Sequence, residues 1–176
     1  MQFSHLLKLH LVTSCLLLTS PAAYSGGYVR LGGMYLSEST EQSSASKSSR
    51  TYLDLGTGTI TRRGLTLGLL YSYEKINSDA SSAKRTSIGP TVGWVSQKER
   101  GPYLLGTYFL SSQLDEGFTG SGYQVDLGYK ILLRKIALAL QLSYKKFSYG
   151  KQSGQALSPE RSDSRIDPYF QIWYEF

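Results

Sequence analysis

Apolar and polar residues alternate with a period of two along most of the chain after residue 25. Each alternating run is about ten residues long and ends in a cluster of polar or turn-forming residues, which is typical of the strands of a membrane β-barrel. Eight runs of this kind predict eight strands. The expected strands are approximately 28–36, 50–61, 65–74, 84–95, 102–111, 123–133, 136–145 and 165–176.

The hairpin over residues 123–145 has the clearest pattern. Leu and Ile alternate with Ala, Gln and Ser along 136–145, after a two-residue turn at Arg134 and Lys135. Pro90 cannot donate a hydrogen bond to a neighbouring strand, so we expect a β-bulge there. The faces of the strand at 102–111 remain unassigned. Both faces of that strand carry large apolar residues, so either could be the apolar face. One face holds Tyr103, Leu105 and Phe109, and the other holds Leu104, Tyr108 and Leu110.

The connections between the runs differ in length in a regular way. Long, Ser-rich segments follow the first, third, fifth and seventh runs, whereas short turns follow the second, fourth and sixth. The long segments are expected at 37–49, 77–83, 112–120 and 150–164. An up-and-down meander places alternate connections at opposite ends of the sheet. The predicted fold is therefore all-β, an eight-stranded antiparallel up-and-down transmembrane β-barrel, with the long loops outside the cell.

The apolar faces could point outward into lipid or inward into the core of a soluble, lipocalin-like barrel. Large apolar side chains cover about ten residues per strand, the length that crosses a bilayer at a steep tilt. The opposite faces are rich in Gly, Ala, Ser and Thr, which fit the narrow interior of an eight-stranded barrel. Aromatic residues also gather near the strand ends, as they do at membrane interfaces. These features favour the transmembrane alternative.

The strand at 165–176 reads R-I-D-P-Y-F-Q-I-W-Y-E-F. An aromatic residue at the end, with large apolar residues two, four and six positions earlier, resembles the C-terminal assembly signal of outer-membrane β-barrels. The resemblance implies that the barrel-assembly machinery recognises Phe170, Ile172, Tyr174 and Phe176. Since an open sheet edge is costly in lipid, this strand must close the barrel by pairing with the first strand near Tyr28 to Leu36.

Two further segments extend the resemblance, S-I-G-P-T-V-G-W at 87–94 and G-P-Y-L-L-G at 101–106. With the whole pattern, they are similar to strands of the OmpA/OmpX-like superfamily of small outer-membrane barrels. That resemblance implies a barrel domain over residues 26–176, in contact with outer-membrane lipid and lipopolysaccharide. We expect a monomer without a peptidoglycan-binding domain.

Residues 1–25 have the features of a cleaved signal peptide. Lys8 precedes an apolar run from Leu9 to Leu18, and small residues precede the expected cleavage before Gly26. The alternative of a lipoprotein site at Cys15 would cut the apolar run in its middle. Export and a barrel fold together predict the outer membrane of a Gram-negative bacterium.

Charged residues on the polar faces predict a network inside the barrel. Five are cationic and five are acidic, and buried charges persist only when they are paired. We therefore expect internal salt bridges that plug the lumen, with a structural role favoured over an ion or proton path. The ten residues are Arg30, Asp54, Glu74, Arg85, Asp126, Lys130, Lys145, Arg165, Asp167 and Glu175.

Catalysis, cofactors and nucleic acid are not expected. Both histidines, His5 and His10, and the one cysteine lie in the signal peptide, and the known small envelope lipid hydrolases and acyltransferases of barrel fold use a histidine. Asp115 and Glu116 could be combined with loop serines, but nothing in their spacing distinguishes them from solvated loop residues. Only Lys8 of the 19 Lys and Arg residues lies in 1–25, so 18 cations face 13 acidic residues, a net charge of +5 without a basic block.

These observations favour a non-enzymatic barrel with a structural or surface-interaction role through its extracellular loops. The alternative is a narrow channel for small or hydrophobic solutes, and a lipid-modifying envelope enzyme ranks third. No metal or cofactor site is predicted.

Overall fold

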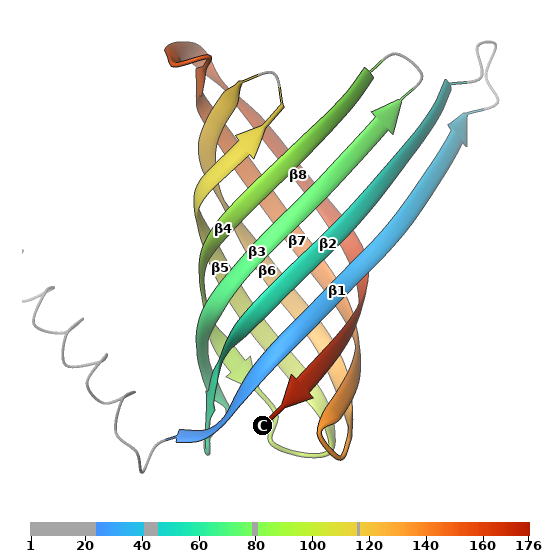
Figure 1. Cartoon of the computed structure of the whole chain (residues 1–176), viewed down its shortest axis with the longest axis vertical. Coiled ribbons are helices and arrows are strands. Elements are labelled where there is room, and N and C mark those ends of the chain that lie inside the picture. The colour runs from blue at the N-terminus through green and yellow to red at the C-terminus, as the bar shows by residue number, and fades with distance from the viewer. Residues whose placement is uncertain (1–23, 41–45, 79–80, 116) are drawn as a thin grey trace, which may run out of the picture.

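The computed structural model describes residues 24–40, 46–78, 81–115 and 117–176. Eight antiparallel strands follow one another in chain order and close into one barrel (Figure 1). The predicted all-β meander is therefore confirmed. The strands are β1 (Tyr24–Thr40), β2 (Ser46–Thr61), β3 (Leu65–Ser78), β4 (Ser81–Val95), β5 (Arg100–Leu114), β6 (Phe118–Leu133), β7 (Ile136–Gln152) and β8 (Gln155–Glu175).

The barrel has two ends that differ in their connections. One end, here called the terminal end, holds the start of β1 and Phe176, together with the turns 62–64, 96–99 and 134–135 (Figure 1). The opposite end, here called the far end, holds the connections that follow β1, β3, β5 and β7. This arrangement follows from the even number of strands in an up-and-down order.

Burial alternates along the strands as the period-two pattern predicts. In β7 the buried residues Ala137 and Ala139 alternate with the exposed residues Leu138 and Leu140. The structure also assigns the faces of β5, which the sequence left open. Tyr103, Leu105, Thr107 and Phe109 point inward, whereas Leu104, Tyr108 and Leu110 point outward.

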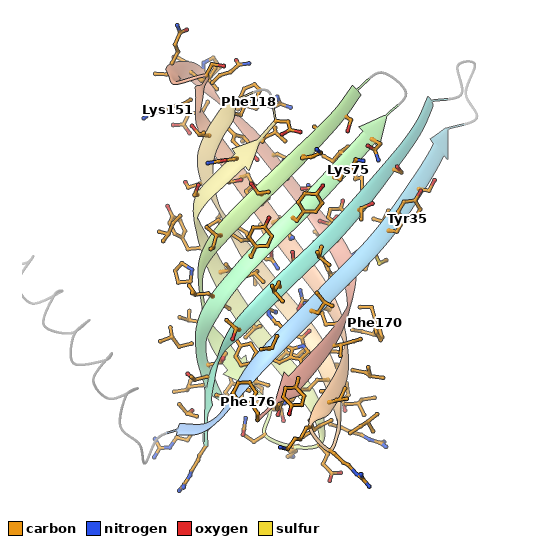
Figure 2. The ribbon with its side chains drawn as sticks, viewed as in Figure 1. Tyr35, Lys75, Phe118, Lys151, Phe170 and Phe176 are labelled. Atoms are coloured by element: carbon orange, nitrogen blue, oxygen red, sulfur yellow. The ribbon has the colours of Figure 1, made fainter. Side chains whose placement is uncertain are left out.

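The outer wall of the barrel is apolar over all eight strands. Tyr35 is 66% exposed, Leu110 69% and Leu140 68%, although all three are large apolar or aromatic residues. Figure 2 shows Tyr35, Phe170 and Phe176 on the outside of the wall. A soluble barrel would bury such residues in its core, so the lipocalin-like alternative is wrong.

The long polar loops predicted at the far end are wrong in extent. β1 continues to Thr40 and β2 begins at Ser46, so most of the segment 37–49 is paired strand. The sequence pattern missed these extensions because apolar periodicity ends where lipid ends, whereas a backbone ladder continues in water. The other three predicted loops, 77–83, 112–120 and 150–164, are likewise mostly strand.

Pro90 lies at an irregularity in the sheet, as predicted. The pairing of β4 with β5 shifts register between Ile88 and Thr91. The extra residue belongs to β5, because Leu110 and Ser111 face outward in succession. The bulge thus places the residue that lacks an N–H where the ladder is already interrupted.

The seam between β1 and β8 closes the ring over a short distance only. Their pairing runs from Tyr28 opposite Glu175 to Gly33 opposite Phe170. The prediction that the last strand pairs with the first to close the barrel is confirmed, over the part of the first strand from Tyr28 to Gly33. In Figure 1 the far end of β1 leans to the upper right, whereas the β7–β8 hairpin stands at the upper left.

Pro168 accounts for the point at which this pairing ends. Gly27 and Phe176 donate backbone hydrogen bonds to each other, at 2.6 and 2.9 Å. In an antiparallel ladder such pairs recur every second residue, so the first one beyond Gly33 and Phe170 would join Tyr35 to Pro168. Proline has no N–H to donate, and the ladder stops one step before it.

The predicted signal peptide lies outside the described residues except for Tyr24 and Ser25, which begin β1. Cleavage before Gly26 therefore stays a prediction. In the described part of the chain, no helix is long and apolar enough to cross a membrane.

Candidate functional site

The interior of the barrel is the candidate site, because charged residues from seven of the eight strands point into it. The inward positions hold all ten residues that the sequence proposed for the lumen. Eight of them are at most 4% exposed, and the side chains of Arg165 and Glu175 are 9% and 22% exposed. Charged groups so deeply buried require partners.

The part of the interior midway between the two ends, here called the middle layer, holds two ion pairs. The first joins β7 to β2 across the lumen. Lys145 Nζ of β7 lies 3.3 Å from Asp54 Oδ1 of β2. Ser72 Oγ donates to the same carboxylate at 2.6 Å and accepts from Lys145 at 3.0 Å. Three strands thus share one buried carboxylate, and its charge is both paired and hydrogen-bonded.

A second ion pair lies beside the first. Arg30 donates to Asp126 Oδ2 at 3.3 Å and to Gln141 Oε1 at 3.4 Å. Gln124 Nε2 donates to Asp126 at 2.7 Å and to Asp54 at 3.3 Å, so one amide connects the two pairs. The middle layer is therefore a single hydrogen-bonded network across the lumen.

Two arginines bind three carboxylates nearer the far end. Arg85 donates to Glu74 at 2.9 Å and to Asp163 at 2.5 Å. Arg165 pairs with Glu74 as well, and its Nε donates to Asp167 at 2.6 Å. Sequence reasoning missed Asp163, because it assigned residues 150–164 to a loop. The signal that could have found it is the inward register it shares with Arg165 and Asp167.

A further ion pair lies at the terminal end. Lys130 of β6 is 1% exposed and pairs with Glu175 of β8. The ten proposed lumen residues thus form several separate groups rather than one chain of charges. Neutral Gln124, which the sequence did not single out, joins Asp54 to Asp126, and Gln141 accepts hydrogen bonds from Arg30 and Tyr103.

Aromatic side chains fill the lumen on either side of the charges. At the terminal end the ring of Trp173 stacks on Tyr28, with centroids 5.0 Å apart, and lies 5.2 Å from Tyr103. We call this group, with its buried neighbours Ile60, Val95 and Leu105, the terminal cluster. Its residues come from five strands, so it closes the lumen below the charges.

The far-end cluster has a different character. It consists of Leu70, Phe109, Leu114, Phe118, Phe147 and Tyr149. Phe109 and Phe147 stack at 5.5 Å, and the guanidinium of Arg85 lies 4.3 Å from the centre of Phe147. Cation–π contacts of this kind hold the charged layer against the aromatic one.

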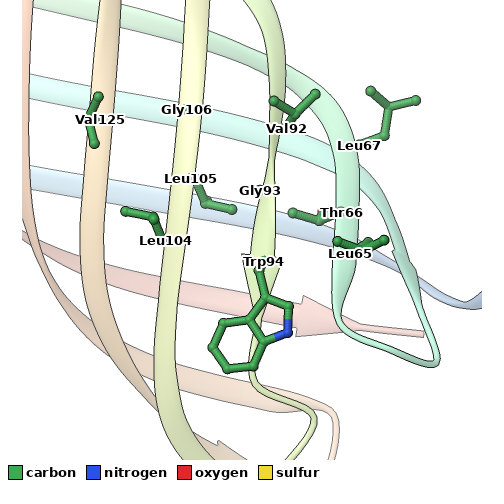
Figure 3. Close-up of a pocket in the computed structure, with 10 residues that line it drawn as sticks. All are labelled: Leu65, Thr66, Leu67, Val92, Gly93, Trp94, Leu104, Leu105, Gly106 and Val125. Atoms are coloured by element: carbon green, nitrogen blue, oxygen red, sulfur yellow. The ribbon is translucent and has the colours of Figure 1, made fainter. Parts of the chain in front are cut away.

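The outer wall carries the four residues of the proposed assembly signal, and a hollow lies on it as well. Phe170, Ile172, Tyr174 and Phe176 are each 45–59% exposed and point away from the lumen. The hollow, of about 550 Å³, lies over Gly106 among Val92, Trp94, Leu104 and Val125 (Figure 3). It faces lipid and belongs to the wall rather than to the interior.

The acidic residue considered for catalysis has a structural contact. Asp115 Oδ2 accepts a hydrogen bond from the backbone N–H of Lys84 at 3.0 Å, at the far end. Glu116 lies outside the described residues. Over the described ranges, no three His, Cys, Asp or Glu side chains are grouped in a way that could hold a metal ion.

An apolar outer belt, a closed ring of strands and a charged interior define a transmembrane β-barrel. The wall is in contact with lipid.

Comparison with models of protein families and with curated protein sequences gave no match. Among solved structures, the chain is similar to neisserial surface protein A, at 18% identity and a TM-score of 0.55, over 86% of this chain and 98% of the other. The outer membrane protein OprG from Pseudomonas aeruginosa is similar at 13% identity and a TM-score of 0.48, over 88% and 98%.

The likeness to neisserial surface protein A confirms the predicted resemblance at the level of the fold. Its fold and the apolar belt of this chain together place the protein in the outer membrane of a Gram-negative bacterium.

Proposed function

We propose that the protein is a non-enzymatic outer-membrane barrel with a plugged lumen, whose role is structural or depends on contacts made by its far end outside the cell. The observation that carries the proposal is the order of the layers along the interior of the barrel. The ion pairs of Lys145 with Asp54 and of Arg30 with Asp126 lie between two aromatic clusters, and their carboxylates are at most 1% exposed, which leaves no room for hydrated ions beside them.

The orientation supports a surface role. In small outer-membrane barrels the short turns and both chain ends face the periplasm. The far end, with its strands extended to Thr40, Ser78 and Gln152, would then project beyond the lipid. A rigid scaffold that presents exposed hairpins is a common support for recognition. On this basis the partners are outer-membrane lipid and lipopolysaccharide, the barrel-assembly machinery during insertion, and a surface ligand, with the barrel acting as a monomer.

Single-channel recording in planar bilayers tests the plugged lumen. We expect no steady openings from the wild-type barrel, since the charges are paired and the clusters fill both ends. Steady openings whose size changes in Glu74→Gln or Lys130→Met would overturn the plugged lumen and favour the narrow channel. Shortening the four far-end hairpins one at a time, in a cell-binding or survival assay, tests the surface role. Unchanged behaviour in all four variants would contradict it.

A further inference from the structure

In the far half of the seam, none of the described strands pairs with the edge of β1 that faces β8. Hydrogen-bonded pairs between β1 and β8 occur at odd-numbered residues of β1, as the reciprocal bonds of Gly27 show. Beyond Gly33 the pairing ends, so the N–H and C=O groups of Tyr35 and Ser37 face the open side. Their neighbours Met34 and Leu36 bond to β2 on the other side.

The gap between β1 and β8 beyond Gly33 and Phe170 is here called the notch. Its two edges are not equivalent. β8 carries Pro168 at the step where pairing ends and Pro159 farther on, with charged residues between them. Prolines and charges are the features by which sheet edges avoid additional strands. β1 has no proline between Tyr24 and Thr40, and its free edge is therefore the one that can accept another strand.

Unsatisfied hydrogen-bond donors lie behind the notch. Among the described residues, the Tyr169 hydroxyl and Gln171 Nε2 have no hydrogen-bond partner, although these residues are 1% and 0% exposed. Gln171 lies opposite Gly32, in the last part of the seam that pairs, and Tyr169 contacts Tyr52 of β2 with ring centroids 5.8 Å apart. Buried donors without acceptors are costly, and an acceptor side chain that enters the lumen through the notch would satisfy them once the groups that cover them move aside.

The outer side of the notch has the opposite chemistry. Tyr35 of β1 and Ile166 of β8 are 66% and 63% exposed and point outward. A segment in the notch would therefore meet apolar groups on one face and hydrogen-bond donors on the other. In an extended chain, successive side chains point to these two faces in turn.

We propose that the notch between β1 and β8 is a docking site for an extended polypeptide segment, which pairs with the free edge of β1 as an additional strand. The segment alternates acceptor side chains, such as Glu, toward the lumen with apolar side chains toward the outside. This inference rests on the proposed function, because it names the surface and the partner class of the far end. Backbone bonds to Tyr35 and Ser37 supply the affinity, and the alternation supplies the specificity.

The test uses the folded barrel in detergent micelles and three synthetic peptides. The first is a blocked octapeptide of alternating Val and Glu, the second replaces Glu with Lys, and the third is the first with N-methylated backbone amides. We expect the first to bind and to slow amide exchange at Tyr35 and Ser37, and the other two to bind at least about tenfold more weakly, because they lose acceptors or edge hydrogen bonds.

Two variants address the notch from its two sides. Tyr35→Pro removes a donor that takes no part in the β1–β2 ladder, and we expect about tenfold weaker binding with the barrel intact. Pro168→Thr restores a donor on β8, so that the seam can pair further and exclude the peptide. Ser37→Ala keeps the backbone and serves as the control with unchanged affinity. Gel migration with and without heating reports folding of each variant.

Other occupants would give different results. Protection of Tyr35 by dodecyl phosphate but not by the peptide would identify a lipid and overturn the proposal. Protection that depends on protein concentration, with dimers in sedimentation, would identify a second copy and overturn it too. If the N-methylated peptide bound as tightly as the first peptide, the proposal would also be overturned. If peptide binding fails while shortened hairpins still change cell binding, the docking site is wrong and the proposed function stands.

Discussion

The two halves of the barrel achieve closure by different means. In the terminal half, each strand is paired on both sides, up to the last pair of Gly33 and Phe170. In the far half, the neighbouring ladders continue for several more residues, but β1 and β8 separate. Lipid cannot satisfy a free backbone edge, whereas water can. Backbone pairing is therefore complete around the terminal half, whereas beyond Gly33 and Phe170 the seam is open beside the outward residues Tyr35 and Ile166.

The side chains that fill the interior also differ between the two halves. The terminal cluster relies on stacked neutral rings, Tyr28 on Trp173, with one nearby ion pair. The far-end cluster is interleaved with arginines that bind three carboxylates. The ion pair of Lys145 and Asp54 lies between the two clusters.

The largest expected effect comes from breaking that central pair. Lys145→Met leaves the Asp54 carboxylate, which is 1% exposed, without its cation. We expect a loss of about 3–5 kcal/mol in the free energy of unfolding, measured by denaturant titration in detergent. The double variant Lys145→Met with Asp54→Leu should recover most of the loss. Lys151→Met, at an exposed position, is the control, and an equal loss there would contradict the pairing argument.

A smaller effect is expected at the seam. Removing Phe176 deletes its two backbone hydrogen bonds with Gly27, at 2.6 and 2.9 Å, and the ring that packs over Gly27. We expect a loss of about 2 kcal/mol and a smaller folded fraction in gels run without heating. Phe176→Leu keeps the backbone bonds and should lose less. Normal assembly of the deletion variant would show that closure does not depend on this residue.

Sequence reasoning succeeded where side chains meet lipid or a narrow lumen. The alternation along residues 136–145 predicted both faces of β7, because lipid and lumen impose opposite polarity on successive residues. The same parity placed Arg30 and Asp126 on inward faces, but it could not say that they pair, since the register between distant strands determines that contact.

The far half was less predictable for a physical reason. Segments such as 37–40 carry no alternation of apolar and polar residues in the sequence, and only backbone pairing makes them strands. Asp163 was missed in the same way. The effect of Pro168 depends on which neighbour its missing N–H would face, and that follows from the register rather than from the local sequence.

A gain of stability is expected from extending the seam. Pro168→Thr supplies the N–H that the next pair with Tyr35 lacks. We expect about 1 kcal/mol of additional stability and slower amide exchange at Tyr35. Ile166→Thr introduces the same side chain without a new donor and is the matched control. An unchanged exchange rate at Tyr35 in Pro168→Thr would mean that something other than the missing donor separates the strands.

The smallest effect concerns the wall of the terminal half, where backbone pairing is already complete. Gly106 faces the hollow of the outer wall, and an added Cβ would meet only the Val92 carbonyl oxygen, 3.9 Å away (Figure 3). Gly106→Ala should therefore stabilise the barrel by about 0.4–1 kcal/mol, chiefly by restricting the unfolded chain. Gly128→Ala is the contrast, because its Cβ would collide with the ring of Tyr103 in the lumen and should destabilise. If both substitutions changed the free energy of unfolding in the same direction, packing in the terminal half would not distinguish its lipid-facing wall from its filled interior.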